Sequence, residues 1–139
     1  MKYSAPVVRG KGRGKKLGFP TLNLRISSLN GFDFPHGIYA GYVWLGGIPP
    51  PRGFGEARQF RAAFHYGPVP TFHNARPSLE AFVLDAPALA APPHVAFELL
   101  AYLREIKKFP SSGTLIRAMR EDVRRTKQII SPLRPPRAL

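Results

Sequence analysis

Short runs of aromatic and β-branched residues, separated by glycine- and proline-rich segments, fill this chain up to about residue 103. Such runs are typical of strands. A Gly-Gly pair at 46 and 47 indicates a chain reversal, and three consecutive prolines within 48–58 indicate a loop. The predicted strands cover residues 37–45, 59–66, 79–84 and 95–103.

A helix is predicted after the last of these runs. Ser111 or Ser112 can cap its first turn. Apolar residues then recur at near-helical spacing and leave the arginines on the outside. Four to six short strands and one terminal helix predict a mainly β fold, a small closed barrel capped by the helix, with a sandwich as the alternative. The apolar helix positions are Leu115, Ile116, Met119, Val123 and Ile130.

Length and composition indicate one domain. The chain has 139 residues, of which 44% are hydrophobic, and we expect residues 1–130 to form the domain and the Pro/Arg-rich residues 131–139 to form a flexible tail. There is no apolar run of about 20 residues and no signal peptide pattern, so we expect a soluble, cytoplasmic protein. We also expect a monomer. The chain has no cysteine, and its four histidines lack metal-ligand spacing. Any metal ion is therefore expected to be bound by oxygen atoms.

Residues 10–23 combine glycines and cations with the segment Pro-Thr-Leu-Asn. Glycine lets backbone amides turn toward an anion. Thr21 and Asn23 lie on one face of an extended segment, and their oxygens suit Mg²⁺. The glycine spacing matches neither the P-loop nor the Rossmann pattern. The predicted nucleotide-binding residues are Gly10, Gly12, Arg13, Gly14, Lys15, Lys16, Gly18, Pro20 and Thr21.

The net charge of +13 predicts a positive field that attracts phosphates, nucleotides or nucleic acid. A mobile basic arm is an alternative for residues 10–18, although the apolar segment that follows does not suit a disordered arm. A basic RNA-binding barrel is an alternative for the whole chain. Against it, the aromatic residues mostly alternate as core residues do and do not interleave with arginine and lysine.

The order of these features resembles the riboflavin kinase (flavokinase) family. That family opens with a glycine-rich loop followed by Leu-Gly-(Phe/Ile)-Pro-Thr-Ala-Asn, and here Leu22 replaces the alanine. Later landmarks follow in the same order over most of the chain. They are Gly-Ile-Tyr-Ala at 37–40, Tyr-Gly and Pro-Thr-Phe within 66–72, Leu-Glu at 79–80, and the terminal pattern from Leu103 to Asp122.

The resemblance implies a six-stranded Greek-key barrel that transfers the γ-phosphoryl group of ATP to the 5′-hydroxyl of riboflavin, giving FMN with the help of Mg²⁺. It implies that Glu80 is the general base and that Asn23 orients Glu80 or the metal. Lys15 or Lys16, with the loop amides, would hold the β- and γ-phosphates. Arg104 and Phe109 would contact the flavin.

Plainer interpretations stand beside these roles. A strand glutamate such as Glu80 usually faces water. Phe109 could serve as a core anchor at the helix entrance. Arg104 could pair with Glu98 or Glu105 instead of contacting a flavin.

The chain also departs from the family pattern. Phe82 stands where members usually carry a histidine two residues after the glutamate, and residues 88–93 lack the usual Asp-Leu-Tyr-Gly turn. His65 stands where a small polar residue is common. These changes leave the phosphoryl donor open between ATP and another nucleotide such as CTP, and leave a non-catalytic flavin binder as a third hypothesis.

Overall fold

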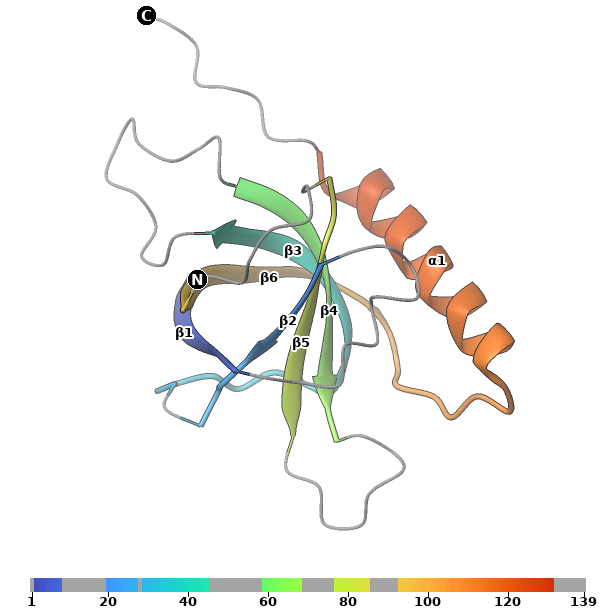
Figure 1. Ribbon diagram of the computed structural model, residues 1–139, viewed down its shortest axis with the longest axis horizontal. Coiled ribbons are helices and arrows are strands. Elements are labelled where there is room, and N and C mark those ends of the chain that lie inside the picture. The colour runs from blue at the N-terminus through green and yellow to red at the C-terminus, as the bar shows by residue number, and fades with distance from the viewer. Residues whose placement is uncertain are drawn as a thin grey trace, which may run out of the picture.

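A computed structural model of this chain describes residues 2–8, 20–27, 29–45, 59–68, 77–85 and 93–131. Six strands and one helix lie in these ranges (Figure 1). All four strands predicted from residue 37 onward are confirmed, with ends that agree to within one residue. The elements are β1 (Tyr3–Val8), β2 (Thr21–Leu24), β3 (Gly37–Leu45), β4 (Gln59–Gly67), β5 (Ser78–Val83), β6 (His94–Arg104) and α1 (Ser112–Ile129).

The six strands form a closed antiparallel barrel in the order β1-β2-β5-β4-β3-β6, and β6 pairs again with β1. Strands β3, β4 and β5 are sequential neighbours, and β6 returns to lie beside β3, which is the Greek-key arrangement. Closure pairs every strand on both sides, so the sheet has no free edge. The predicted barrel is confirmed, and the sandwich alternative is wrong.

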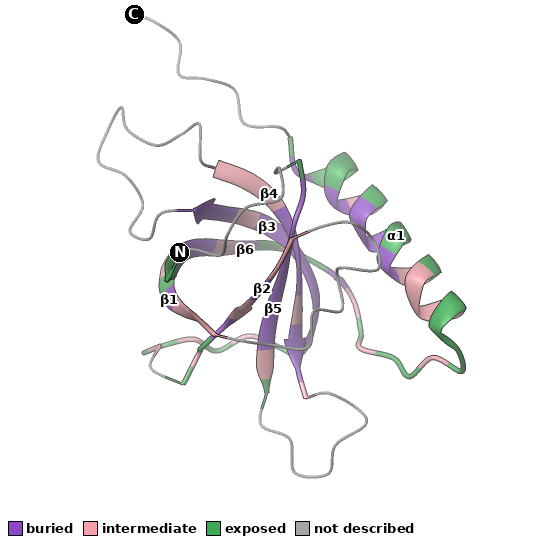
Figure 2. Ribbon diagram, viewed as in Figure 1, coloured by how far each residue is buried: buried purple, intermediate pink, exposed green. Residues whose placement is uncertain are grey.

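The barrel core follows from the alternation of side chains along each strand. On β5, Leu79, Ala81 and Val83 enter the main core cluster, whereas the residues between them face outward. Phe64 and Phe97 lie in that core with no exposed surface, and Figure 2 shows the buried strand residues along the barrel. The aromatic side chains of the strands therefore stabilise the core, as the alternating pattern predicts.

Helix α1 packs against the outside of the barrel, beside β3 and β4 (Figure 1). Ser111 is the N-cap, and it forms a capping box with Thr114. Met119 packs against Ala63 of β4 and Phe82 of β5. Within the described residues, no helix is both long and apolar enough to span a membrane.

The cations of α1 divide into two groups. Arg117, Arg120 and Arg124 are exposed, as the helical pattern predicts. Arg125 is half-buried instead, and its Nη1 donates a hydrogen bond of 2.8 Å to the carbonyl oxygen of Leu103. One of the helix arginines therefore helps to attach α1 to β6.

Strand β1 was not among the strands predicted from the sequence, because Pro6 interrupts its apolar run. Proline has no N–H to donate and is rare inside sheets. In the barrel, Pro6 forms the last pair of the β1–β6 ladder, opposite His94, and its carbonyl oxygen accepts a hydrogen bond from Arg25. The proline is tolerated because it lies at the end of this ladder.

Strands β3 and β6 approach one another closely at Gly41. A Cβ atom added there would lie 1.9 Å from the carbonyl oxygen of Glu98, and the β3–β6 register shifts between Ala40 and Gly41. No side chain fits in that space. The glycine therefore permits the tight pairing that closes this part of the barrel.

Candidate functional site

Strand pairing places five residues side by side across five strands. Asn23 lies opposite Glu80, Glu80 opposite His65, His65 opposite Ile38, and Ile38 opposite Arg104. Directly opposed residues of an antiparallel pair project from the same face of the sheet. Asn23, Glu80, His65 and Ile38 lie on the outer face, since their strand neighbours enter the core. Arg104 also lies there, because it bonds Asp122 of α1, which packs on the outside of the barrel. We call this set the outer row.

Glu80 is almost completely buried, with 3% of its surface exposed, although it faces away from the barrel core. The alternative of an ordinary strand glutamate facing water is therefore wrong. A carboxylate held out of water at this depth is typical of a functional group or of a strong structural partner. Its position beside Asn23 brings together the predicted base and one predicted metal ligand.

Thr21 occupies the next outward position along β2, opposite Phe82. Its Oγ1 atom is buried and has no hydrogen-bond partner among the described residues. A buried hydroxyl without a partner is costly, so this oxygen suits an additional ligand atom. Among the residues that the structure describes, no three His, Asp or Glu side chains gather into a group that could hold a metal ion. The donor set present is the hydroxyl of Thr21 and the amide oxygen of Asn23, which fits a hard cation such as Mg²⁺.

Most of the predicted nucleotide-binding segment lies outside the described residues. Gly10, Gly12, Arg13, Gly14, Lys15, Lys16 and Gly18 therefore remain predictions. The segment's final residues are described. The carbonyl oxygen of Pro20 accepts a hydrogen bond of 2.9 Å from the backbone N–H of Val83, which fixes the start of β2 against β5. Residues 20–23 consequently lie alongside Glu80.

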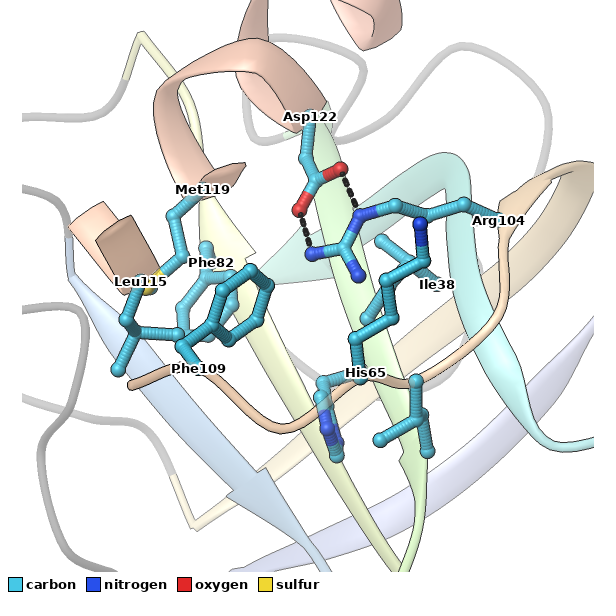
Figure 3. A pocket seen from close by; sticks show the side chains of 10 residues that line it. Ile38, His65, Phe82, Arg104, Phe109, Leu115, Met119 and Asp122 are labelled. Atoms are coloured by element: carbon cyan, nitrogen blue, oxygen red, sulfur yellow. Dashed lines mark hydrogen bonds and ion pairs between the residues drawn. The ribbon is translucent and has the colours of Figure 1, made fainter. Parts of the chain in front are cut away.

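A pocket of about 450 Å³, part of it open to solvent, lies between the outer face of the barrel and α1 (Figure 3). Its wall is mostly apolar, and a few polar groups converge on it, which is the usual composition of a small-molecule site. Three members of the outer row belong to this wall. The lining residues are Ile38, His65, Phe82, Arg104, Ile106, Lys107, Phe109, Leu115, Met119 and Asp122.

Arg104 is held at the pocket by Asp122 of α1. Its Nε donates to Oδ1 at 2.8 Å and its Nη2 to Oδ2 at 2.7 Å, so the pair is bidentate, as the dashed lines in Figure 3 show. Its Nη1 donates to the carbonyl oxygen of Glu105 at 2.9 Å. The suggested pairing of Arg104 with the carboxylate of Glu98 or Glu105 is therefore wrong. The packing of helix α1 near the end of β6 brings Asp122 within hydrogen-bond distance of Arg104.

Asp122 was matched to the family's terminal pattern but was given no role from the sequence. Only 4% of its surface is exposed, and burial raises the pKa of its carboxyl above the ordinary value of 3.8, although the hydrogen bonds from Arg104 oppose that change. A signal was available in the sequence. Asp122 lies between Met119 and Val123, on the apolar face of the predicted helix, where a carboxylate needs a partner.

Phe109 and Phe82 line the same pocket from different elements. Phe109 is half-buried, and the guanidinium carbon of Arg104 lies 5.6 Å from its ring centroid, within cation–π range. The ring of Phe109 is therefore part of the pocket wall and is not a fully buried core anchor. Phe82 is 7% exposed and packs in one cluster with Ala63 and Met119. Phe82, which stands where family members usually carry a histidine, therefore has a packing role, because its side chain joins the barrel to α1.

The fold and the outer row define a small Greek-key barrel with a pocket on its outer face. The chain matches the family model described as Flavokinase, riboflavin kinase, over residues 1–130. It therefore belongs to the riboflavin kinase family, and the resemblance inferred from the sequence motifs is confirmed.

Two solved structures have the same fold. The crystal structure of a macrolide-efflux protein from Streptococcus pneumoniae is similar with a TM-score of 0.71 and 24% identity, and the match covers 93% of this chain but 39% of that one. The crystal structure of riboflavin kinase from Trypanosoma brucei is similar with a TM-score of 0.57 and 18% identity, covering 92% of this chain and 78% of that one. This chain thus spans about two fifths of the first structure's length. At these identities the likeness concerns the fold alone.

Proposed function

We propose that this protein is a riboflavin kinase that transfers the γ-phosphoryl group of ATP to the 5′-hydroxyl of riboflavin, giving FMN and ADP. Membership of the riboflavin kinase family supports the reaction class. The observation that carries the proposal is the position of Glu80. This buried carboxylate lies in the outer row between Asn23, a predicted metal ligand, and His65, which lines the pocket.

Glu80 is the proposed general base. As the 5′-oxygen of riboflavin forms its bond to the γ-phosphorus, its proton passes to the carboxylate of Glu80. The bond from the γ-phosphorus to the bridging oxygen breaks, and ADP leaves with that electron pair. An alcohol hydroxyl has a high pKa, so a base within hydrogen-bond reach lowers the barrier. Burial of Glu80 keeps bulk water from competing for that position.

Thr21 and Asn23 are the proposed protein ligands of Mg²⁺. When bound, the metal would neutralise charge on the phosphoryl oxygens during transfer. The buried hydroxyl oxygen of Thr21 and the neighbouring amide of Asn23 supply donors without adding negative charge near Glu80. The glycines and lysines of residues 10–18 would bind the β- and γ-phosphates of ATP through amides and ammonium groups.

The pocket beside α1 is the proposed flavin site. Its apolar lining, which includes Phe109 and Leu115, suits a flat aromatic ring. Arg104 makes three hydrogen bonds to Asp122 and Glu105. A guanidinium has about five N–H donors, so about two remain for the polar edge of the ring. The paired carboxylate of Asp122 holds that guanidinium in place.

The test is incubation of the purified protein with riboflavin, Mg²⁺ and each nucleoside triphosphate in turn, with FMN resolved by chromatography. We expect FMN with ATP, and a different donor would correct only the nucleotide. No FMN from the folded protein, together with quenching of flavin fluorescence, would favour a non-catalytic flavin binder. Neither FMN nor quenching, together with RNA affinity that falls steeply between about 50 and 200 mM salt, would favour an RNA-binding barrel.

A further inference from the structure

His65 lies between the two halves of the proposed site. Neighbouring strands are about 4.8 Å apart, so His65 of β4 lies one strand spacing from Glu80 of β5 and two from Arg104 of β6. Glu80, the proposed base, and Arg104, a polar group of the proposed ring site, thus lie on opposite sides of this histidine. A substrate that reaches from one to the other must pass along the outer row beside it.

Of the two residues that lie between Glu80 and Arg104 in the outer row, His65 has the side chain that can form hydrogen bonds. Ile38, the neighbour of His65 on the Arg104 side, offers no hydrogen bond. Arg104 and Asp122 are engaged with each other at another part of the pocket, and Figure 3 shows His65 apart from that pair. An imidazole carries two ring nitrogens, so one of them can bond to a hydroxyl group, as donor or acceptor, while the other keeps a different partner. The ribityl chain of the proposed substrate is a polyol, so it would offer hydroxyl groups to this side chain.

We propose that His65 is a substrate-binding residue that hydrogen-bonds an internal hydroxyl of the ribityl chain and so sets the terminal hydroxyl against Glu80. The inference rests on the proposed function, whose substrate supplies the chain. It assigns this histidine a part in specificity, because a flavin without internal hydroxyls would lose the contact. A site built to bond a hydroxyl discriminates against an analogue that lacks it.

The experiment compares riboflavin with a flavin analogue that carries a 5-hydroxypentyl chain, which keeps the terminal hydroxyl and lacks the internal ones. The ratio of kcat/KM for the two substrates is measured for the wild type, His65→Ala and His65→Gln. We expect His65→Ala to lower that ratio about tenfold, the effect of one good hydrogen bond. The loss should fall on riboflavin, and the analogue should be nearly unaffected. His65→Gln keeps a donor and an acceptor and should retain part of the preference.

The matched control is Ile38→Val, which trims the apolar neighbour of His65 in the outer row. It is expected to change kcat/KM for both substrates by the same factor and to leave their ratio intact. An equal effect of His65→Ala on both substrates, or no effect, would overturn the proposal. Thermal unfolding of each variant confirms that the proteins compared are folded.

The same design separates this inference from the proposed function. If the wild type makes FMN and the ratio is unchanged in His65→Ala, only the inference fails. If the wild type phosphorylates neither flavin, the proposed function fails, and the inference is then judged on dissociation constants measured by quenching of flavin fluorescence. An unchanged preference in those constants, or no flavin binding at all, overturns it.

Discussion

Asn23 of β2 and Glu80 of β5 are directly opposed across one antiparallel strand pair. Their side chains therefore leave the barrel on the same face, and the carboxylate is buried there. Thr21 lies two residues before Asn23 on that face, with its hydroxyl oxygen buried. One strand pair thus places the predicted base and both predicted metal ligands together.

Glu80→Gln should lower the turnover number by about 10²-fold or more, because removal of a general base costs rate and not ground-state affinity. The substitution keeps the shape of the side chain. Riboflavin affinity, measured by fluorescence quenching, should remain close to that of the wild type. Wild-type turnover in this variant would contradict the role of Glu80.

Thr21→Val should raise the Mg²⁺ concentration required for half-maximal activity. The hydroxyl oxygen has no partner among the described residues, so its loss should leave the melting temperature unchanged or slightly higher. Thr21→Ser, which keeps the hydroxyl, is the control and should have a metal requirement near that of the wild type. An unchanged Mg²⁺ titration in the valine variant would exclude ligation by Thr21.

Arg104→Met should destabilise the folded protein at pH 7 by about 3 kcal/mol, because it leaves the buried carboxylate of Asp122 without its partner. Urea unfolding measures this change. Arg124→Met is the matched control, since that residue forms an exposed ion pair with Glu121, and no measurable change is expected. Equal stability of both variants would mean that the Arg104–Asp122 pair does not stabilise the fold.

The cost of Arg104→Met should also depend on pH. Burial raises the pKa of Asp122 above 3.8, so in the wild type this carboxyl favours the folded state most below pH 3.8 and progressively less as the pH rises through its raised pKa. Loss of Arg104 removes the interaction that opposes this change and raises the pKa further. The destabilisation should therefore shrink as the pH falls and Asp122 becomes neutral. A cost that is constant from pH 7 to the acid limit would contradict this account.

Gly41→Ala should destabilise the barrel by about 3 kcal/mol or more, because the added Cβ would overlap the carbonyl oxygen of Glu98. Gly113→Ala is the control. That glycine lies in the first turn of α1, where a Cβ would meet nothing closer than 3.8 Å, and alanine should stabilise the helix by about 0.5 kcal/mol. Thermal or urea unfolding of the pair distinguishes the close strand approach from a general effect of losing glycine.

Local patterns were sufficient to predict much of the fold. The β-type runs at 37–45 and 79–84 became β3 and β5, and the apolar spacing from Leu115 to Val123 became the buried face of α1. These signals depend on neighbouring residues and on side-chain alternation, so they can be read without knowledge of the pairing. Strand β1 was missed because its signal was interrupted by Pro6, whose tolerance depends on its position in the finished ladder.

The site was predictable only in part, for a related reason. Thr21, Asn23 and Glu80 came from motif order, and their proximity agrees with the strand register. The contacts of Arg104 were not predictable, because Asp122 reaches it only after α1 has packed on the barrel. The place of His65 beside Glu80 likewise depends on the pairing of β4 with β5, which no local pattern specifies.

The alternation of β5 has a consequence for how the activity can be lost. Glu80 and Phe82 face outward, while Leu79 and Ala81 face the core. A slip of β5 by one residue would exchange the two sets and would force a carboxylate into the barrel interior. The barrel is therefore strongly disfavoured when β5 is out of register, and the same burial that stabilises the core keeps the outer row aligned.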